Sequence, residues 1–257
     1  MFIINHFNSV YDFFWGAMIA SSRIYGVMII CPVFSSNYLT KMLKVCLAFI
    51  FGIMVLPYVG QQLILPASII GRSFFIIKEL IIGFMVGYAL AFPFWLIETV
   101  GNIIDRQRGE QMGAVINPLT NSSTSSIGKV LIQAFTTYFI VANGFIFIFS
   151  ILFNSFMVLP LTEFDYFSHF QNTDIYVGLF STYFNYAVLL TMPIIGVMLL
   201  LELVLGLISS FIPQLNVTVI SMPLKTAVGM FILILYIAIL YHNILDKFTV
   251  GIRGIYG

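Results

Sequence analysis

Six long apolar runs divide this sequence, and they constrain its fold more than any other feature. A helix rises about 1.5 Å per residue, so about 20 apolar residues cross a hydrocarbon core about 30 Å thick. The runs are rich in Leu, Ile, Met and Phe and lack the alternating pattern of barrel strands. We therefore predict an all-α, polytopic membrane protein whose apolar helices cover about residues 11–32, 43–60, 70–97, 129–153, 176–211 and 218–245.

The composition excludes several classes of protein. Hydrophobic residues make up 60% and charged residues 8% of the 257 residues, whereas a soluble domain carries about 25% charged residues. A formal net charge of +1 provides no electrostatic basis for binding nucleic acid. Cys31, Cys46 and the three histidines show no metal-binding spacing, so we expect no metal and no cofactor.

Five charged residues lie well inside the apolar runs, away from the ends of the runs: Arg23, Lys78, Glu79, Glu202 and Lys225. A charge in such a position costs about 3 kcal/mol or more, so each needs a polar partner. Lys78 and Glu79 point about 100° apart on a helix, and we expect their partners to come from elsewhere. One interpretation is an ion or proton path, and the other is pairing between subunits. We favour pairing, because no convincing internal repeat of the transporter kind is present.

A small-residue pattern lies in the third run, where Gly83 and Gly87 have GxxxG spacing. Small residues at this spacing allow two helix backbones to approach closely. We interpret this pattern as a site of helix packing.

The longest polar interruption covers residues 98–129, and it suggests either a connector outside the membrane or a loop in a polar lumen. Irregular backbone at membrane depth is tolerated where it lines a water-filled path. Its glycines at 101, 109, 113 and 128 and the pair Asn117-Pro118 favour turns. It contains no Ser-His-Asp group and no phosphate-binding glycine loop, so enzymatic chemistry is poorly supported.

Two stretches resemble the SctT/SpaR/FliR family of type III secretion export-apparatus proteins. One is KELIIGFMVGYAL followed by ETVGNIIDRQRGEQMGAVINP, and the other is FIPQLNVTVISMPLKTAVGMFIL. The resemblance runs over essentially the whole chain and is closest to SpaR-type injectisome members, which come from animal-pathogen systems.

The resemblance implies a non-enzymatic subunit of an export gate in the bacterial inner membrane. Its expected partners are SctR-like, SctS-like and SctU-like subunits, membrane lipid, and unfolded effector proteins in transit. Residues 1–175 would form an SctR-like region and residues 176–257 an SctS-like hairpin and tail. Glu202 and Lys225 would then have partners on neighbouring subunits. The alternative from another class is a stand-alone proton-coupled transporter that uses Lys78, Glu79 and Glu202.

The resemblance also implies two functional segments. A plug loop that closes the pore would cover about residues 105–125. Its matching residues are Asp105, Arg106, Gln107, Arg108, Gly109, Glu110, Gln111, Met112, Gly113, Asn117 and Pro118. The SctS-like turn would lie at Pro213, Gln214, Leu215 and Asn216, followed by Pro223 and Lys225.

Overall fold

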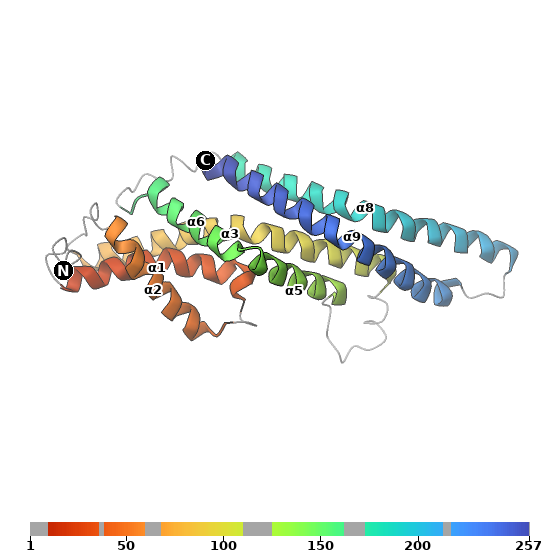
Figure 1. The fold of residues 1–257 in the computed structure, drawn as a ribbon, viewed down its shortest axis with the longest axis horizontal. Helices are drawn as coiled ribbons and strands as arrows, with labels where there is room; N and C mark the ends of the chain where they lie inside the picture. The colour runs from red at the N-terminus through yellow and green to blue at the C-terminus, as the bar shows by residue number, and fades with distance from the viewer. Residues whose placement is uncertain are drawn as a thin grey trace. The chain divides into compact units, whose positions relative to one another are not determined.

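Helices account for all the regular structure in the part of the chain that the computed structural model describes (Figure 1). These described residues are 10–35, 39–59, 68–109, 125–161, 173–212 and 217–256. The all-α prediction is therefore confirmed. The elements are α1 (Val10–Ile30), η2 (Pro32–Phe34), α2 (Lys41–Val59), α3 (Ile69–Arg108), α5 (Ser126–Val141), α6 (Gly144–Val158), α8 (Thr173–Phe211) and α9 (Val217–Tyr256).

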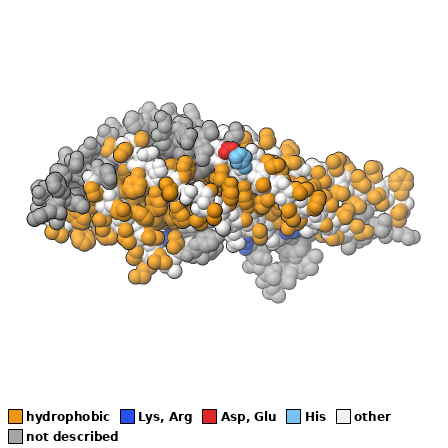
Figure 2. All heavy atoms as spheres, viewed as in Figure 1, with side chains coloured by type: hydrophobic (Ala, Val, Ile, Leu, Met, Phe, Trp, Pro, Cys, Tyr) orange, Lys and Arg blue, Asp and Glu red, His pale blue; other side chains and the backbone are white. Residues whose placement is uncertain are grey.

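Four helices are long and apolar enough to cross a membrane, as judged from the described residues. They are α1, α3, residues 181–211 of α8 and residues 220–246 of α9. The pair α5 and α6 would add a fifth span if it crosses as one broken unit. The polytopic prediction is confirmed, but with fewer qualifying spans than the six apolar runs. Hydrophobic side chains also predominate on the face shown in Figure 2, as expected for a protein surrounded by lipid or apolar protein.

The predicted helix over 129–153 is wrong, because the structure divides this run into α5 and α6. Asn143 between them has a φ of 61°, in the left-handed region that asparagine tolerates better than most residues. A helix cannot continue through that conformation. The apolar pattern did not reveal the break because Ala142 and Asn143 are short and lie inside a hydrophobic run.

The polar interruption also begins later than predicted, because α3 continues through Glu98 to Arg108. Ile97, Val100 and Ile104 are completely buried and recur at helical spacing. They extend the apolar face of α3 beneath the polar residues. The helix ends at Arg108, and the φ of 89° at the next residue, Gly109, is the left-handed conformation that glycine provides at helix ends.

The proline residues in the two C-terminal helices do not end them. α8 continues through Pro193 and α9 through Pro223. A proline removes one backbone hydrogen bond, but the surrounding turns remain helical. The long run at 176–211 therefore forms one helix of 39 residues.

The chain forms two compact units. Unit 1 comprises Met1–Phe92, Phe139–Thr173 and Ile252–Gly257, and it contains α1, α2, the first part of α3, and α6. Unit 2 comprises Pro93–Tyr138 and Asp174–Gly251. In unit 2 the ring of Phe135 packs against Phe94 and Tyr241, with ring centroids 5.3 and 5.4 Å apart. This aromatic core joins α3, α5 and α9.

Candidate functional site

A buried ion pair between Arg23 on α1 and Glu79 on α3 lies within unit 1. The Nε and Nη2 atoms of Arg23 are both 2.6 Å from Oε2 of Glu79. Both side chains are completely inaccessible to solvent. A charge buried in this way is stable only with a partner and further hydrogen bonds, so the two helices depend on each other here.

The remaining donors of this cluster reach the C-terminal end of α6. Arg23 donates from Nη1 to the Ser155 carbonyl at 2.8 Å and from Nη2 to the Leu159 carbonyl at 2.9 Å. Lys78 donates to the Leu161 carbonyl at 2.8 Å. The last carbonyls of a helix lack partners within the helix and carry partial negative charge. Arg23 therefore caps the end of α6, and Lys78 binds the chain just beyond it.

This arrangement corrects two expectations for Lys78 and Glu79. They were expected not to pair with each other, yet Nζ of Lys78 lies 3.2 Å from Oε1 of Glu79. The flexible lysine side chain can bend toward its neighbour because both groups lie at the end of α6. The partners expected on other subunits are also replaced, since Arg23 of the same chain neutralises Glu79.

The two glycines of the GxxxG pattern face α1 in unit 1. A Cβ atom at Gly83 would lie 2.2 Å from the Arg23 carbonyl oxygen, and one at Gly87 would lie 2.9 Å from Cα of Val27. On α1, a Cβ atom at Gly26 would lie 2.7 Å from the Leu80 carbonyl oxygen. The two backbones thus approach more closely than side chains would allow, and this contact places Arg23 beside Glu79.

Replacing Gly83 with alanine is expected to separate α1 from α3 and to lower the free energy of unfolding by about 1–3 kcal/mol. The clash is with backbone atoms of Arg23, which cannot rotate away. Thermal unfolding of the detergent-purified protein measures the effect. Gly196→Ala is the matched control, because no atom lies within 4 Å of the added Cβ. Equal stability of the two variants would contradict the proposed contact.

A second polar cluster lies in unit 2, at the two ends of the segment 110–124. Oδ2 of Asp105, near the end of α3, accepts hydrogen bonds from the Ser125 hydroxyl and from the Ile127 N–H, the latter at 2.8 Å. The Ser125 hydroxyl also accepts from the Gly128 N–H at 2.8 Å. Arg108 forms an ion pair with Asp105, with Nε 2.6 Å from Oδ1. Asp105 and Ser125 therefore cap the first turn of α5 together.

Two glycines allow α3 and α5 to cross closely beside this cluster. A Cβ atom at Gly101 would lie 2.4 Å from Cα of Gly128. Both glycines lie inside helices, so the prediction of turns at these positions is wrong. Their role is close backbone approach, which brings Asp105 within reach of Ser125. We refer to Gly101, Asp105, Arg108, Ser125 and Gly128 as the loop base.

A third polar group of unit 2 joins α3, α8 and α9. Nζ of Lys225 lies 2.9 Å from Oε2 of Glu202, and the Gln107 amide donates to the same oxygen at 3.5 Å. Glu202 and Lys225 thus pair with each other within the chain, and a partner on a neighbouring subunit stays a prediction. Pro223 lies exposed in α9, two residues before Lys225.

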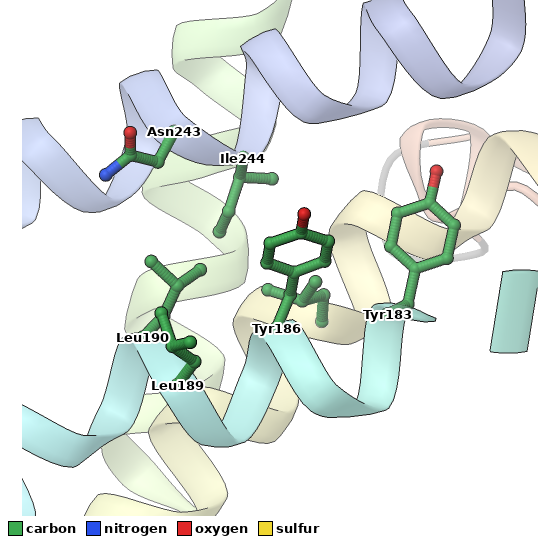
Figure 3. Close-up of a pocket in the computed structure, with 7 residues that line it drawn as sticks. Tyr183, Tyr186, Leu189, Leu190, Asn243 and Ile244 are labelled. Carbon is green, nitrogen blue, oxygen red and sulfur yellow. The ribbon is translucent and has the colours of Figure 1, made fainter. Parts of the chain in front are cut away.

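A cavity of about 190 Å³ also lies in unit 2, and Figure 3 shows its lining. Its walls come from α3, α8 and α9, and they carry two phenol hydroxyls and one amide among aliphatic side chains. These walls contain no carboxylate, imidazole or thiol, so the cavity offers no acid–base pair. The lining residues are Leu96, Tyr183, Tyr186, Leu189, Leu190, Asn243 and Ile244.

The two cysteines have different environments. Cys31 is buried, and burial raises the pKa of its thiol to about 12. The reactive thiolate is therefore scarce at neutral pH. Cys46 on α2 is exposed.

Sequence reasoning missed the residues that complete these clusters, chiefly Ser125 and the carbonyl groups of Ser155 and Leu159. No local signal identifies them, because each acts through a partner 20 or more residues away. Of the remaining predicted residues, Arg106 lies exposed on the last turn of α3. Outside the described residues are Glu110, Gln111, Met112, Gly113, Asn117, Pro118, Pro213, Gln214 and Asn216.

Comparison with known proteins places these features in a family. The sequence model for bacterial export proteins, family 1, matches residues 14–250. The chain is 33% identical to Yop proteins translocation protein T of Yersinia pestis over 215 residues, which cover 83% of this chain and 82% of that protein. It is 30% identical to secretion system apparatus protein SsaT of Salmonella typhimurium, with 77% and 78% covered. Flagellar biosynthetic protein FliR of Escherichia coli is 25% identical, with 84% and 80% covered.

Proposed function

The chain belongs to the bacterial export proteins, family 1, and we propose that it is a non-enzymatic subunit of a type III secretion export gate. In this role it forms part of the pore for unfolded effector proteins and closes that pore with its polar loop. Membership of the family supports a role in bacterial protein export, and the long apolar helices support a multi-pass location in the inner membrane. The contribution to the pore and the closure by a plug go beyond what family membership supports, and they are the parts that we propose.

The loop base is the observation that carries the plug assignment. Asp105 binds Ser125 and the first turn of α5, so the segment 110–124 leaves and re-enters the helical part of the chain at one place. A polar segment between two apolar helices, held at both ends, has the properties that a pore-closing loop needs. Of the residues that matched the family motif, Asp105 and Arg108 belong to the loop base, because they lie on the last turn of α3 and pair with each other.

The proposed partners are SctR-like and SctS-like subunits, and an SctU-like subunit. The large exposed apolar area of α8 and α9 supports partners in the membrane. In the most apolar stretch of each helix, only 22% of the residues in α8 and 28% of those in α9 are buried by the described chain. We retain residues 176–257 as the SctS-like part and residues 1–175 as the SctR-like part. This division rests on the family resemblance, whereas the two compact units rest on contacts within the chain.

The alternative of a stand-alone proton-coupled transporter is less well supported by the geometry. Such a mechanism needs carboxylates that can exchange protons with water. Glu79 is completely buried and is held by Arg23. Glu202 is accessible, but Lys225 already neutralises it. We therefore assign these charges to packing.

Replacing residues 110–124 with a four-residue Gly/Ser linker is expected to increase ion leak through the assembled gate. The change removes the proposed plug but leaves Asp105 and Ser125, so the loop base is retained. Conductance across the inner membrane of cells that express the complete gate measures the effect. A control variant carries a 15-residue Gly/Ser segment in place of 110–124, which separates loss of chain length from loss of sequence. A gate that assembles normally and does not leak with the short linker would rule out the plug.

A further inference from the structure

The C-terminal half of α8 has little cover from the described part of its own chain. The buried residues of α8 recur up to Met198, and within residues 199–212 none is buried. Its outward side is apolar and exposed, and the largest contributors are Leu199, Leu200, Leu203, Val204, Leu207 and Phe211. Its described neighbours are the end of α3, through Gln107, and the first half of α9, which packs at Met198, where a Cβ built on Gly229 would meet Cε. Figure 1 shows these two helices running antiparallel.

Glu202 interrupts this apolar surface. Its side chain is 53% exposed, although it lies between exposed leucines at positions 200 and 203. Lys225 and Gln107 both reach Oε2 of the carboxylate. No described residue donates a hydrogen bond to Oε1. A carboxylate oxygen without a donor, next to lipid or apolar protein, costs several kcal/mol.

We propose that Oε1 of Glu202 accepts a hydrogen bond from an amide or hydroxyl group on a helix of a neighbouring gate subunit. This helix packs on the apolar face formed by Leu199, Leu200, Leu203, Val204 and Leu207. The inference rests on the proposed function, because it requires that the chain assembles with other membrane subunits. It adds the chemistry that the partner helix must present at this position.

Charge balance indicates a neutral donor. Glu202 and Lys225 already sum to zero charge at a separation of 2.9 Å. A lysine or arginine from the partner would leave one positive charge uncompensated in a low-dielectric interface, which is strongly unfavourable. An amide or hydroxyl satisfies the free oxygen without adding charge. The partner helix is therefore apolar, with one Asn, Gln, Ser or Thr opposite Glu202.

Two double variants separate this role of Glu202 from its pairing with Lys225. Glu202→Gln with Lys225→Met keeps an acceptor oxygen at position 202, and Glu202→Leu with Lys225→Met removes it. Both lack the internal ion pair. The complete chain is co-expressed with the SctR-like and SctS-like subunits of its secretion system, and the amount of co-purified complex is measured. We expect the Gln/Met variant to assemble nearly as well as the wild type, and the Leu/Met variant to lose about 3- to 30-fold.

Each other outcome has a separate meaning. Equal assembly of the two variants would overturn the proposal, because Glu202 would then serve Lys225 alone. Loss of assembly in the Gln/Met variant would also overturn it, because the partner would require a charged carboxylate. A photo-reactive residue in place of Leu203, in an otherwise wild-type chain, provides a readout that does not depend on the folding of the double variants. Crosslinks to lipid alone would overturn the proposal that a partner helix packs here. If the wild-type chain does not co-purify with the export subunits, the proposed function fails instead.

Discussion

Replacing Arg23 with leucine is expected to lower the free energy of unfolding by about 3–5 kcal/mol, the usual cost of removing one member of a buried ion pair. The change leaves Glu79 buried with Lys78 as its only remaining charged contact among the described residues. It also removes the donors that reach the Ser155 and Leu159 carbonyls at the end of α6. Thermal unfolding in detergent and the amount of protein in the membrane fraction measure the effect.

Two controls make this result specific. Arg72→Leu breaks the pair with Asp12, whose side chain is 26% exposed and can be solvated, so a smaller loss is expected. The double variant Arg23→Leu with Glu79→Leu removes both charges and should regain part of the stability. A double variant less stable than Arg23→Leu would show that Glu79 does not depend on Arg23.

Replacing Asp105 with leucine is the second change with a large expected effect, again about 3–5 kcal/mol. The carboxylate side chain is 4% exposed and holds Arg108, the Ser125 hydroxyl and the Ile127 N–H. Its loss removes the ion pair of Arg108 and leaves the Ile127 N–H without this acceptor. If the loop base anchors the plug, ion leak through the assembled gate should also increase.

Asp105→Asn tests the same site more gently, because the amide oxygen can still accept from Ile127 while the charge is lost. We expect its stability to lie between that of the wild type and that of Asp105→Leu. Arg106→Ala is the matched surface control on the same turn, with an expected change within about 0.5 kcal/mol. An effect of Arg106→Ala as large as that of Asp105→Leu would contradict the assignment of Asp105 to the loop base.

The apolar runs predicted the helices well because membrane solvation makes hydrophobic length a direct physical signal. The ends of the helices were harder to predict. Glu98 to Arg108 reads as polar loop, yet Val100 and Ile104 maintain a buried face beneath the charges. Asn143 breaks a helix inside a continuous apolar run, because its left-handed conformation is a local backbone choice that hydrophobicity does not report.

The sequence identified which charged residues matter, but it did not predict which of them pair with each other. The cost of a charge in an apolar run identified Arg23 and Glu79, whereas their mutual contact depends on how α1 and α3 pack. Glycine spacing at Gly83 and Gly87 indicated a close helix contact without naming the partner helix. Gly101 and Gly128 have the same function, but each stands alone in a polar stretch and therefore resembles a turn residue.

The wide sequence separation of the Arg23 cluster has a consequence for the order of events during synthesis. Glu79 follows Arg23 by 56 residues, and Ser155 follows it by 132. At about 5–20 residues per second, α1 leaves the ribosome about 3–11 s before its counter-ion exists. During that interval it carries an uncompensated cation, which costs about 2.5–3.5 kcal/mol at the centre of a bilayer. Pairing with Glu79 offsets this cost only after α3 has been made, which favours insertion of α1 and α3 as a pair.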